Sequence, residues 1–173
     1  VHADRPEERQ PAGERLVVTV FRGLVPTAAG AGPYTPQGVD NYDPLATEGY
    51  FIGVDNATFG NLQLRRVSTP GATPTISGNV TIAVSATSFP ISVPQAGNPL
   101  ISLDALDDRL FAAHIRNGRL WTAHNIAVNT TGVAVTTGGT RRDACRWYEL
   151  QNVASPGTPS VVQSGTLFDS AAS

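Results

Sequence analysis

The sequence predicts an all-β fold, and three observations lead to that prediction. The 173 residues include 17 glycines and 13 prolines beside a hydrophobic content of 40%, a balance typical of many short elements joined by turns. Apolar residues occur in short runs bounded by turn residues, and no stretch shows the long 3.6-residue period of an amphipathic helix. An Asn-Gly pair at 117–118 separates two such runs, which is the strongest short-range signal for a β-hairpin.

Residues 107–167 form the clearest unit, because four short strands follow one another there. We expect these strands at 108–115, 119–126, 145–150 and 161–167. The first is apolar on both faces, as in a strand covered on both sides, whereas the fourth is polar enough to be an outer edge. Four strands whose burial falls from the first to the fourth have the size and rhythm of one propeller blade.

A second, weaker unit precedes this one. Residues 1–14 are polar and charged and are expected to be a flexible lead-in. A first strand is expected at 16–21, and a long ordered loop over 23–44, where Gly, Pro, Ala and Thr dominate. Further strands are expected at 49–55, 62–67, 80–84 and 100–103. We therefore divide residues 15–173 into degenerate repeats at about 47–103 and 104–168, offset by roughly 60 residues.

Five short motifs carry a family resemblance, at 48–56, 108–110, 117–121, 146–150 and 163–167. They resemble the blades of large secreted bacterial β-propeller proteins of unassigned function. The resemblance implies a partial propeller of two to three four-stranded antiparallel blades, secreted or at the cell surface. Since propellers typically have four or more blades, it also implies completion by the remaining blades of a longer chain or by self-association through sheet edges. A β-sandwich or jelly roll is the alternative fold, because short strands with regular turns fit it too.

Composition limits the classes of partner. Charged residues make up 15% of the chain and the formal net charge is −2, so no basic surface for nucleic acid or anionic membrane is expected. No apolar run approaches the length of a membrane-spanning helix. The single cysteine, Cys145, excludes an internal disulfide and a cysteine-based zinc site. No apolar signal-peptide core precedes the first residues, so we expect any export signal to have been removed.

Asp104, Asp107 and Asp108 are the candidate metal ligands. Three carboxylates within five residues can bind a hard cation such as calcium through oxygen ligands. Their spacing does not match an EF-hand loop, however. The favoured interpretation is a solvated turn whose aspartates accept backbone N–H bonds, with calcium as the alternative and no other cofactor expected.

His114, His124 and Tyr148 are the candidate binding residues. The two histidines lie on successive strands of the Asn-Gly hairpin and could share a face with Asp108 as a metal or acid–base pair. Two histidines without a third fixed ligand are more typical of a hydrogen-bonded structural role. Trp121, Trp147 and Tyr148 could form a stacking platform for sugar rings, but aromatic residues in strands usually belong to the core, and we expect that of both tryptophans.

The sequence favours a non-enzymatic module for binding or structural assembly, outside the cytoplasm, and we assign no catalytic residue. It contains no Gly-x-Ser-x-Gly elbow and no phosphate-binding glycine loop. The alternative is a fragment of a carbohydrate-active propeller enzyme, in which Asp104, Asp108 and His114 would lie near the axis. Convergence of those three side chains in one cavity would favour the enzyme, and separate positions would favour the binding module.

Overall fold

The computed structural model describes residues 30–70 and 72–171, and these residues form β-structure with no helix. The lead-in at 1–14 and the strand expected at 16–21 lie outside the described residues. The strands are β1 (Pro33–Asn41), β2 (Glu48–Asp55), β3 (Asn61–Ser68), β4 (Thr75–Ile76), β5 (Val80–Ala83), β6 (Val93–Gln95), β7 (Asn98–Leu103), β8 (Ala112–Arg116), β9 (Arg119–Val128), β10 (Arg142–Gln151) and β11 (Ser160–Leu167). The all-β prediction is confirmed, and no helix of the described part is long and apolar enough to cross a membrane.

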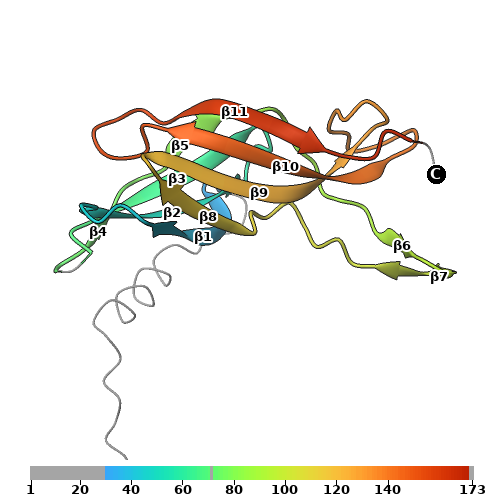
Figure 1. The fold of residues 1–173 in the computed structure, drawn as a ribbon, viewed down its shortest axis with the longest axis horizontal. Coiled ribbons are helices and arrows are strands. Elements are labelled where there is room, and N and C mark those ends of the chain that lie inside the picture. The colour runs from blue at the N-terminus through green and yellow to red at the C-terminus, as the bar shows by residue number, and fades with distance from the viewer. Residues whose placement is uncertain (1–29, 71, 172–173) are drawn as a thin grey trace, which may run out of the picture.

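Nine strands share one mixed sheet in the order β11-β10-β9-β8-β1-β2-β3-β4, with β5 also paired to β3 (Figure 1). The neighbouring pairs in the sheet are antiparallel except β1 with β8, which run parallel. Two antiparallel meanders, one from β1 to β5 and one from β8 to β11, are therefore joined edge to edge. Strands of both expected repeats belong to this one sheet, whereas β6 and β7 of the first repeat form a sheet of their own, and the described residues form no closed barrel and no propeller.

The strand β1 corrects one prediction. Its residues fall within the long loop expected at 23–44, whose described part contains this nine-residue strand. Local propensity does not predict this strand because it contains Pro33, Pro36 and Gly38. Proline removes a ladder donor and glycine weakens a strand. Pairing on both sides, antiparallel with β2 and parallel with β8, holds it in place despite its composition.

The hairpin between β8 and β9 confirms the Asn-Gly prediction. Asn117 has φ of 51° and Gly118 has φ of 73°, the pair of positive values that a type I′ turn requires. Ala113 and Ile115 of β8 are buried, but Ala112 and His114, which alternate with them, are exposed. The expectation that β8 is covered on both faces is therefore wrong for the described residues. β11 is the polar outer edge that the sequence predicts.

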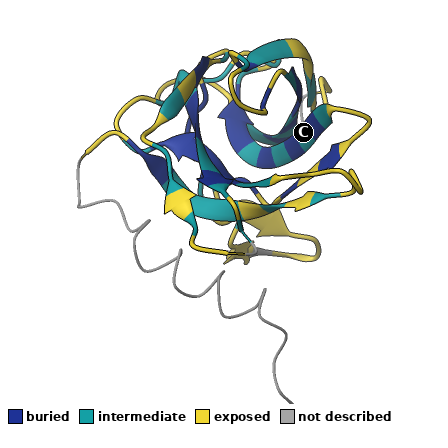
Figure 2. Cartoon of the chain, turned by 90° about the vertical axis from the view of Figure 1, so that its left-hand side faces the viewer, coloured by how far each residue is buried: buried dark blue, intermediate teal, exposed yellow. Residues whose placement is uncertain are grey.

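The sheet curls, and buried residues concentrate in its curled strands (Figure 2), whose side chains form one main core. The core contains Tyr50, Ile52, Val54, Leu62, Leu64, Ile82, Leu110, Ala113, Ile115, Leu120, Tyr148, Leu150 and Val153. Burying each large aliphatic side chain among these contributes about 1.5–3 kcal/mol. Because the curl brings β5 into contact with β11, strands from both meanders enclose the same core.

Polar contacts hold the curl closed at the connection between β10 and β11. The guanidinium of Arg66 on β3 donates from Nε to the carbonyl of Val153 at 2.7 Å and from Nη2 to that of Gly157 at 2.6 Å. On β2, Glu48 Oε2 accepts from the backbone N–H of Ser155 at 3.0 Å. These bonds join segments that are far apart in the sequence, so the first meander fixes the position of a loop in the second.

The strands β6 and β7 form a separate two-stranded sheet that stands away from the curled body (Figure 1). We call residues 93–103, which comprise β6, β7 and their turn, the arm. Its turn passes through Gly97 at φ of 78°. The arm reaches outward from the side of the molecule where β9 and β11 end and β10 begins.

Replacing Gly118 with valine should lower the free energy of unfolding by about 1–2 kcal/mol, because a side chain at positive φ meets its own backbone. Urea unfolding monitored by circular dichroism measures the change. Gly78→Val is the matched control, since a Cβ at Gly78 meets no atom within 4 Å and its φ is not in the strained range. Equal losses for the two variants would contradict the role of the turn.

Candidate functional site

The six residues predicted as ligands or binding residues separate into three places. Asp104 and Asp107 lie on the surface segment before β8, and His114 is exposed on the convex side of the sheet. Asp108, His124 and Tyr148 lie together in the interior. Asp104, Asp108 and His114 therefore do not converge in one cavity.

The turn interpretation is confirmed for the first two aspartates. Asp104 Oδ1 accepts from the backbone N–H of Leu106 at 2.8 Å, and Asp107 Oδ1 accepts from that of Arg109 at 3.0 Å. No group of three or more His, Cys, Asp or Glu side chains within residues 30–70 and 72–171 is arranged to hold a metal ion. The calcium alternative stays a prediction.

Asp107 is the centre of a surface ion pair. The guanidinium of Arg109 grips it through two bonds, Nε to Oδ1 at 2.7 Å and Nη2 to Oδ2 at 2.6 Å. The hydroxyl of Tyr34 donates to Oδ2 at 2.8 Å. The hydrogen bonds from Arg109 are the main reason that the pKa of Asp107 is lowered to about 2, with the Tyr34 bond adding to the effect and partial burial opposing it.

Asp108, His124 and Tyr148 form a buried chain of polar contacts. His124 Nδ1 lies 2.9 Å from the backbone oxygen of Asp108 and 3.0 Å from its Oδ1. Both are acceptors, so Nδ1 carries the proton in the neutral imidazole and Nε2 is left to accept from the Tyr148 hydroxyl, at 3.1 Å. Thr87 Oγ1 donates to Asp108 Oδ2 at 2.6 Å.

These three residues are of the types found in an acid–base relay, but they are closed to solvent, as in a network that only stabilises the fold. Asp108 and His124 are 0% exposed and Tyr148 is 1% exposed, so no substrate reaches them. Burial raises the pKa of Tyr148 well above its usual range, which keeps the phenol protonated as a hydrogen-bond donor. The structural interpretation of His124 is confirmed, and Tyr148 serves the core.

The tryptophans overturn the core expectation. Trp121 on β9 and Trp147 on β10 lie on the convex side, which we call the outer face, and each is only half-buried. Their ring centroids are 6.0 Å apart and their planes differ by 24°. Strand alternation explains the placement, because Leu120 and Thr122 take the inward positions beside Trp121.

Trp121 and Trp147 line a hollow of about 290 Å³ on the outer face. The other lining residues are Phe111, Ala112, His114, Thr122 and Ala123. The register puts His114 opposite Trp121 and Ala123 opposite both Ala112 and Trp147. His114 thus lines the candidate site, whereas His124 and Asp108, which were predicted to share a face with it, do not.

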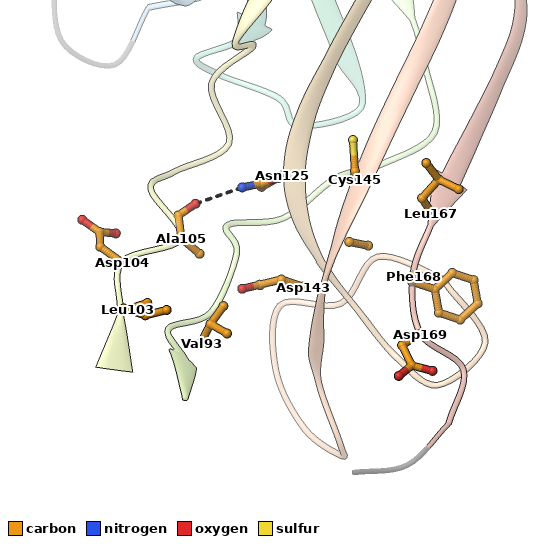
Figure 3. A pocket seen from close by; sticks show the side chains of 11 residues that line it. Val93, Leu103, Asp104, Ala105, Asn125, Asp143, Cys145, Leu167, Phe168 and Asp169 are labelled. Carbon is orange, nitrogen blue, oxygen red and sulfur yellow. Dashed lines mark hydrogen bonds between the residues drawn. The ribbon is translucent and has the colours of Figure 1, made fainter. Parts of the chain in front are cut away.

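A second groove, of about 550 Å³, continues along the same face toward the arm. Figure 3 shows Val93, Leu103 and Asp104 on the arm side and Cys145, Leu167 and Phe168 on the side of β10 and β11. Asp143 Oδ1 accepts from the Ile91 N–H at 2.7 Å, and burial raises the pKa of Asp143. Cys145 is half-buried and lines this groove.

Sequence reasoning missed three residues that shape these sites. Thr87 lies in a segment with no predicted element, yet its hydroxyl donates to the buried Asp108 Oδ2. Glu149 lies in a predicted strand and has no motif of its own, although the register places it beside Trp121. Gly165 looked like an ordinary edge residue, but a Cβ there would lie 2.6–2.8 Å from Trp147 ring atoms. The strand register that reveals all three has no local sequence signal.

Comparisons of the chain with protein-family models, with curated proteins and with solved structures find no match.

Replacing Tyr148 with phenylalanine should lower the free energy of unfolding by about 1–3 kcal/mol, because His124 Nε2 is left buried without its partner. Chemical denaturation at neutral pH measures the loss. Tyr42, which is 67% exposed, provides the control variant Tyr42→Phe, with an expected change below about 0.5 kcal/mol. A neutral Tyr148→Phe variant would contradict the network.

The Asp107 ion pair should make folding stability depend on acidity. Its pKa is about 2 in the folded chain and about 3.9 when unfolded. The unfolded state therefore takes up the proton first, and the stabilisation is full above about pH 5 and is lost as the pH falls toward 2. For a surface pair the loss should be about 1 kcal/mol or less.

Asp107→Asn and Arg109→Gln should each flatten this part of the stability profile between pH 5 and pH 2, since each removes one half of the pair. Denaturant unfolding at closely spaced pH values measures the slope. An unchanged slope in both variants would contradict the assignment.

Proposed function

We propose that this protein is an extracytoplasmic, non-enzymatic assembly module that self-associates through its arm and open sheet edges. One observation carries the proposal: the arm projects apolar side chains into solvent. Leu100 is 94% exposed, Ile101 50%, Leu103 52% and Val93 38%. A two-stranded hairpin is at best marginally stable alone in water, so an arm of this kind gains stability when a partner covers it.

The absence of charged residues from the arm supports the proposal that a partner covers it. Residues 67–103, which end with the arm, contain no Asp, Glu, Lys or Arg. Sheet edges that remain in solvent are commonly guarded by charged side chains, above all lysine. Prolines 94 and 99 remove two backbone donors from the arm, so apolar side-chain contact rather than a long added ladder would provide most of the binding.

A second copy of the chain is the partner that these features fit best. In a two-fold dimer the same patch meets itself, so a charge close to the two-fold axis would lie beside its own copy. An uncharged arm avoids that cost. The free edge of β11 lies at one end of the main sheet and carries exposed Val162 and Leu167, which offers a second apolar contact.

We also propose that the two meanders are blades of a partial propeller, in a protein that is secreted or at the cell surface. Its support is the presence of two antiparallel meanders. Their first strands, β1 and β8, lie side by side and run parallel, and each meander ends at an outer strand of the sheet. The alternative of a carbohydrate-active enzyme is the weaker proposal, because Asp104, Asp108 and His114 lie at separate places.

The test is the native mass of the 173-residue chain over a concentration series, by light scattering after size exclusion. We expect a multiple of 18.1 kDa that reverts to the monomer in the double variant Leu100→Glu, Ile101→Glu, because four buried carboxylates at a dimer interface repel and desolvate. Leu45→Glu is the control, since Leu45 is 85% exposed outside the arm. A wild-type chain that is monomeric at every concentration would overturn self-association.

A further inference from the structure

We propose that the outer face binds a β-linked saccharide, whose sugar rings stack on Trp121 and Trp147. This inference is separate from the assembly proposal, because the arm does not line the hollow beside these rings. We call the two rings with the hollow beside them the platform. The two rings have a fixed orientation, polar groups flank them, and the described residues that line the hollow include no pair of carboxylates.

A glycine fixes the orientation of the Trp147 ring. Gly165 lies opposite Trp147 in the register between β10 and β11. A Cβ built on Gly165 would meet Nε1, Cε2 and Cζ2 of the indole at 2.6–2.8 Å, so the ring lies directly over the bare backbone. The ring packs against the sheet on this side, is stacked with Trp121, and lines the hollow with it.

Trp121 extends the same surface. Its plane differs from that of Trp147 by 24°, with the centroids 6.0 Å apart. The two rings are stacked on one another with an offset, and both line the hollow, so the part of the pair that faces the hollow can receive the rings of an extended glycan. Sugars with equatorial hydroxyls, as in β-1,4-linked glucose or N-acetylglucosamine, have flat C–H faces that stack on aromatic rings, and the hollow of about 290 Å³ accepts the edge of such a ring.

A polar row borders the platform on one side. Glu149 lies opposite Trp121 in the register, and its Oε2 accepts from Gln163 Nε2 at 2.7 Å. Arg119 Nε lies 3.5 Å from Glu149 Oε1, and Arg119 also donates to Gln151. Glu149 is buried and both of its oxygens are engaged, so it positions the half-buried Arg119 and the exposed Gln163, whose groups can meet sugar hydroxyls that both donate and accept.

The charge of this row favours a neutral saccharide over other ring-bearing ligands. Arg119 is paired with Glu149, so it adds little field for the phosphates of a nucleic acid. The chain as a whole has a formal net charge of −2. An apolar peptide would bury the side chains of the row without meeting their hydrogen-bonding needs.

The lining supports binding rather than cleavage. Glycoside hydrolysis generally uses two carboxyl groups on either side of the scissile bond. None of the described residues that line the hollow is Asp or Glu, and Glu149 stands beside the platform already bonded to Gln163. The proposal therefore contains no covalent step.

The test is titration calorimetry of the full chain with cellohexaose and with chitohexaose, and with the helical α-linked maltohexaose as the comparison sugar. We expect one of the β-linked sugars to bind, with maltohexaose at least about tenfold weaker because its curved chain cannot lie on two near-parallel rings. Trp121→Ala and Trp147→Ala should each weaken binding by about tenfold or more, and Trp121→Phe should restore part of it. Tyr42→Ala, an exposed aromatic residue off the platform, should bind as the wild type does.

Gly165→Ala tests the platform without removing an aromatic residue, because the new methyl group displaces the Trp147 ring. It should weaken binding in a chain whose circular dichroism spectrum remains native. The arm variant Leu100→Glu, Ile101→Glu should keep wild-type sugar affinity, which separates this proposal from the assembly proposal.

Two results would overturn the saccharide proposal. One is the absence of binding by all three sugars to the folded wild-type chain. The other is sugar binding that Trp121→Ala leaves intact while the same variant changes the native mass, since the outer face would then be a protein interface.

Discussion

The parallel pairing of β1 with β8 is the contact on which the rest of the structure depends. It matches Val39 with Ala113, Asp40 with His114 and Asn41 with Ile115, and it is the only place where the two meanders share a ladder in the described sheet. With the two joined there, the sheet curls and encloses one core that neither could enclose alone. Arg66 and Glu48 then hold the far side of the curl against the loop between β10 and β11.

This arrangement divides the polar chemistry of the chain between two sides of the sheet. The concave side is filled by the core and by the buried contacts of Asp108, His124 and Tyr148, which stiffen the interior and are closed to solvent. What is open to a ligand or partner is the outer face with its tryptophans and the arm with its exposed apolar residues. Both proposals therefore concern surfaces, in keeping with a module that binds or assembles.

The candidate site was predictable in its residue types and unpredictable in its grouping. Asp104 and Asp107 behave as turn aspartates, and His124 behaves as a structural histidine, because those roles depend on local chemistry. The separation of His114 from His124 follows from strand parity in the hairpin, with one inside and one outside. The position of Trp147 over Gly165 depends on a register across two strands, for which the sequence holds no neighbouring signal.

The sequence by itself determined the all-β class, the Asn-Gly hairpin and the approximate positions of the strands in residues 104–168, because these follow from turn chemistry and short apolar runs. It also determined that charge would be sparse, and that the arm would carry none. Only the tertiary structure decided that β1 is a strand, that the two units share one sheet, and which side of each strand meets the core. Those outcomes depend on pairing between distant segments, whose energy is not encoded in any one of them.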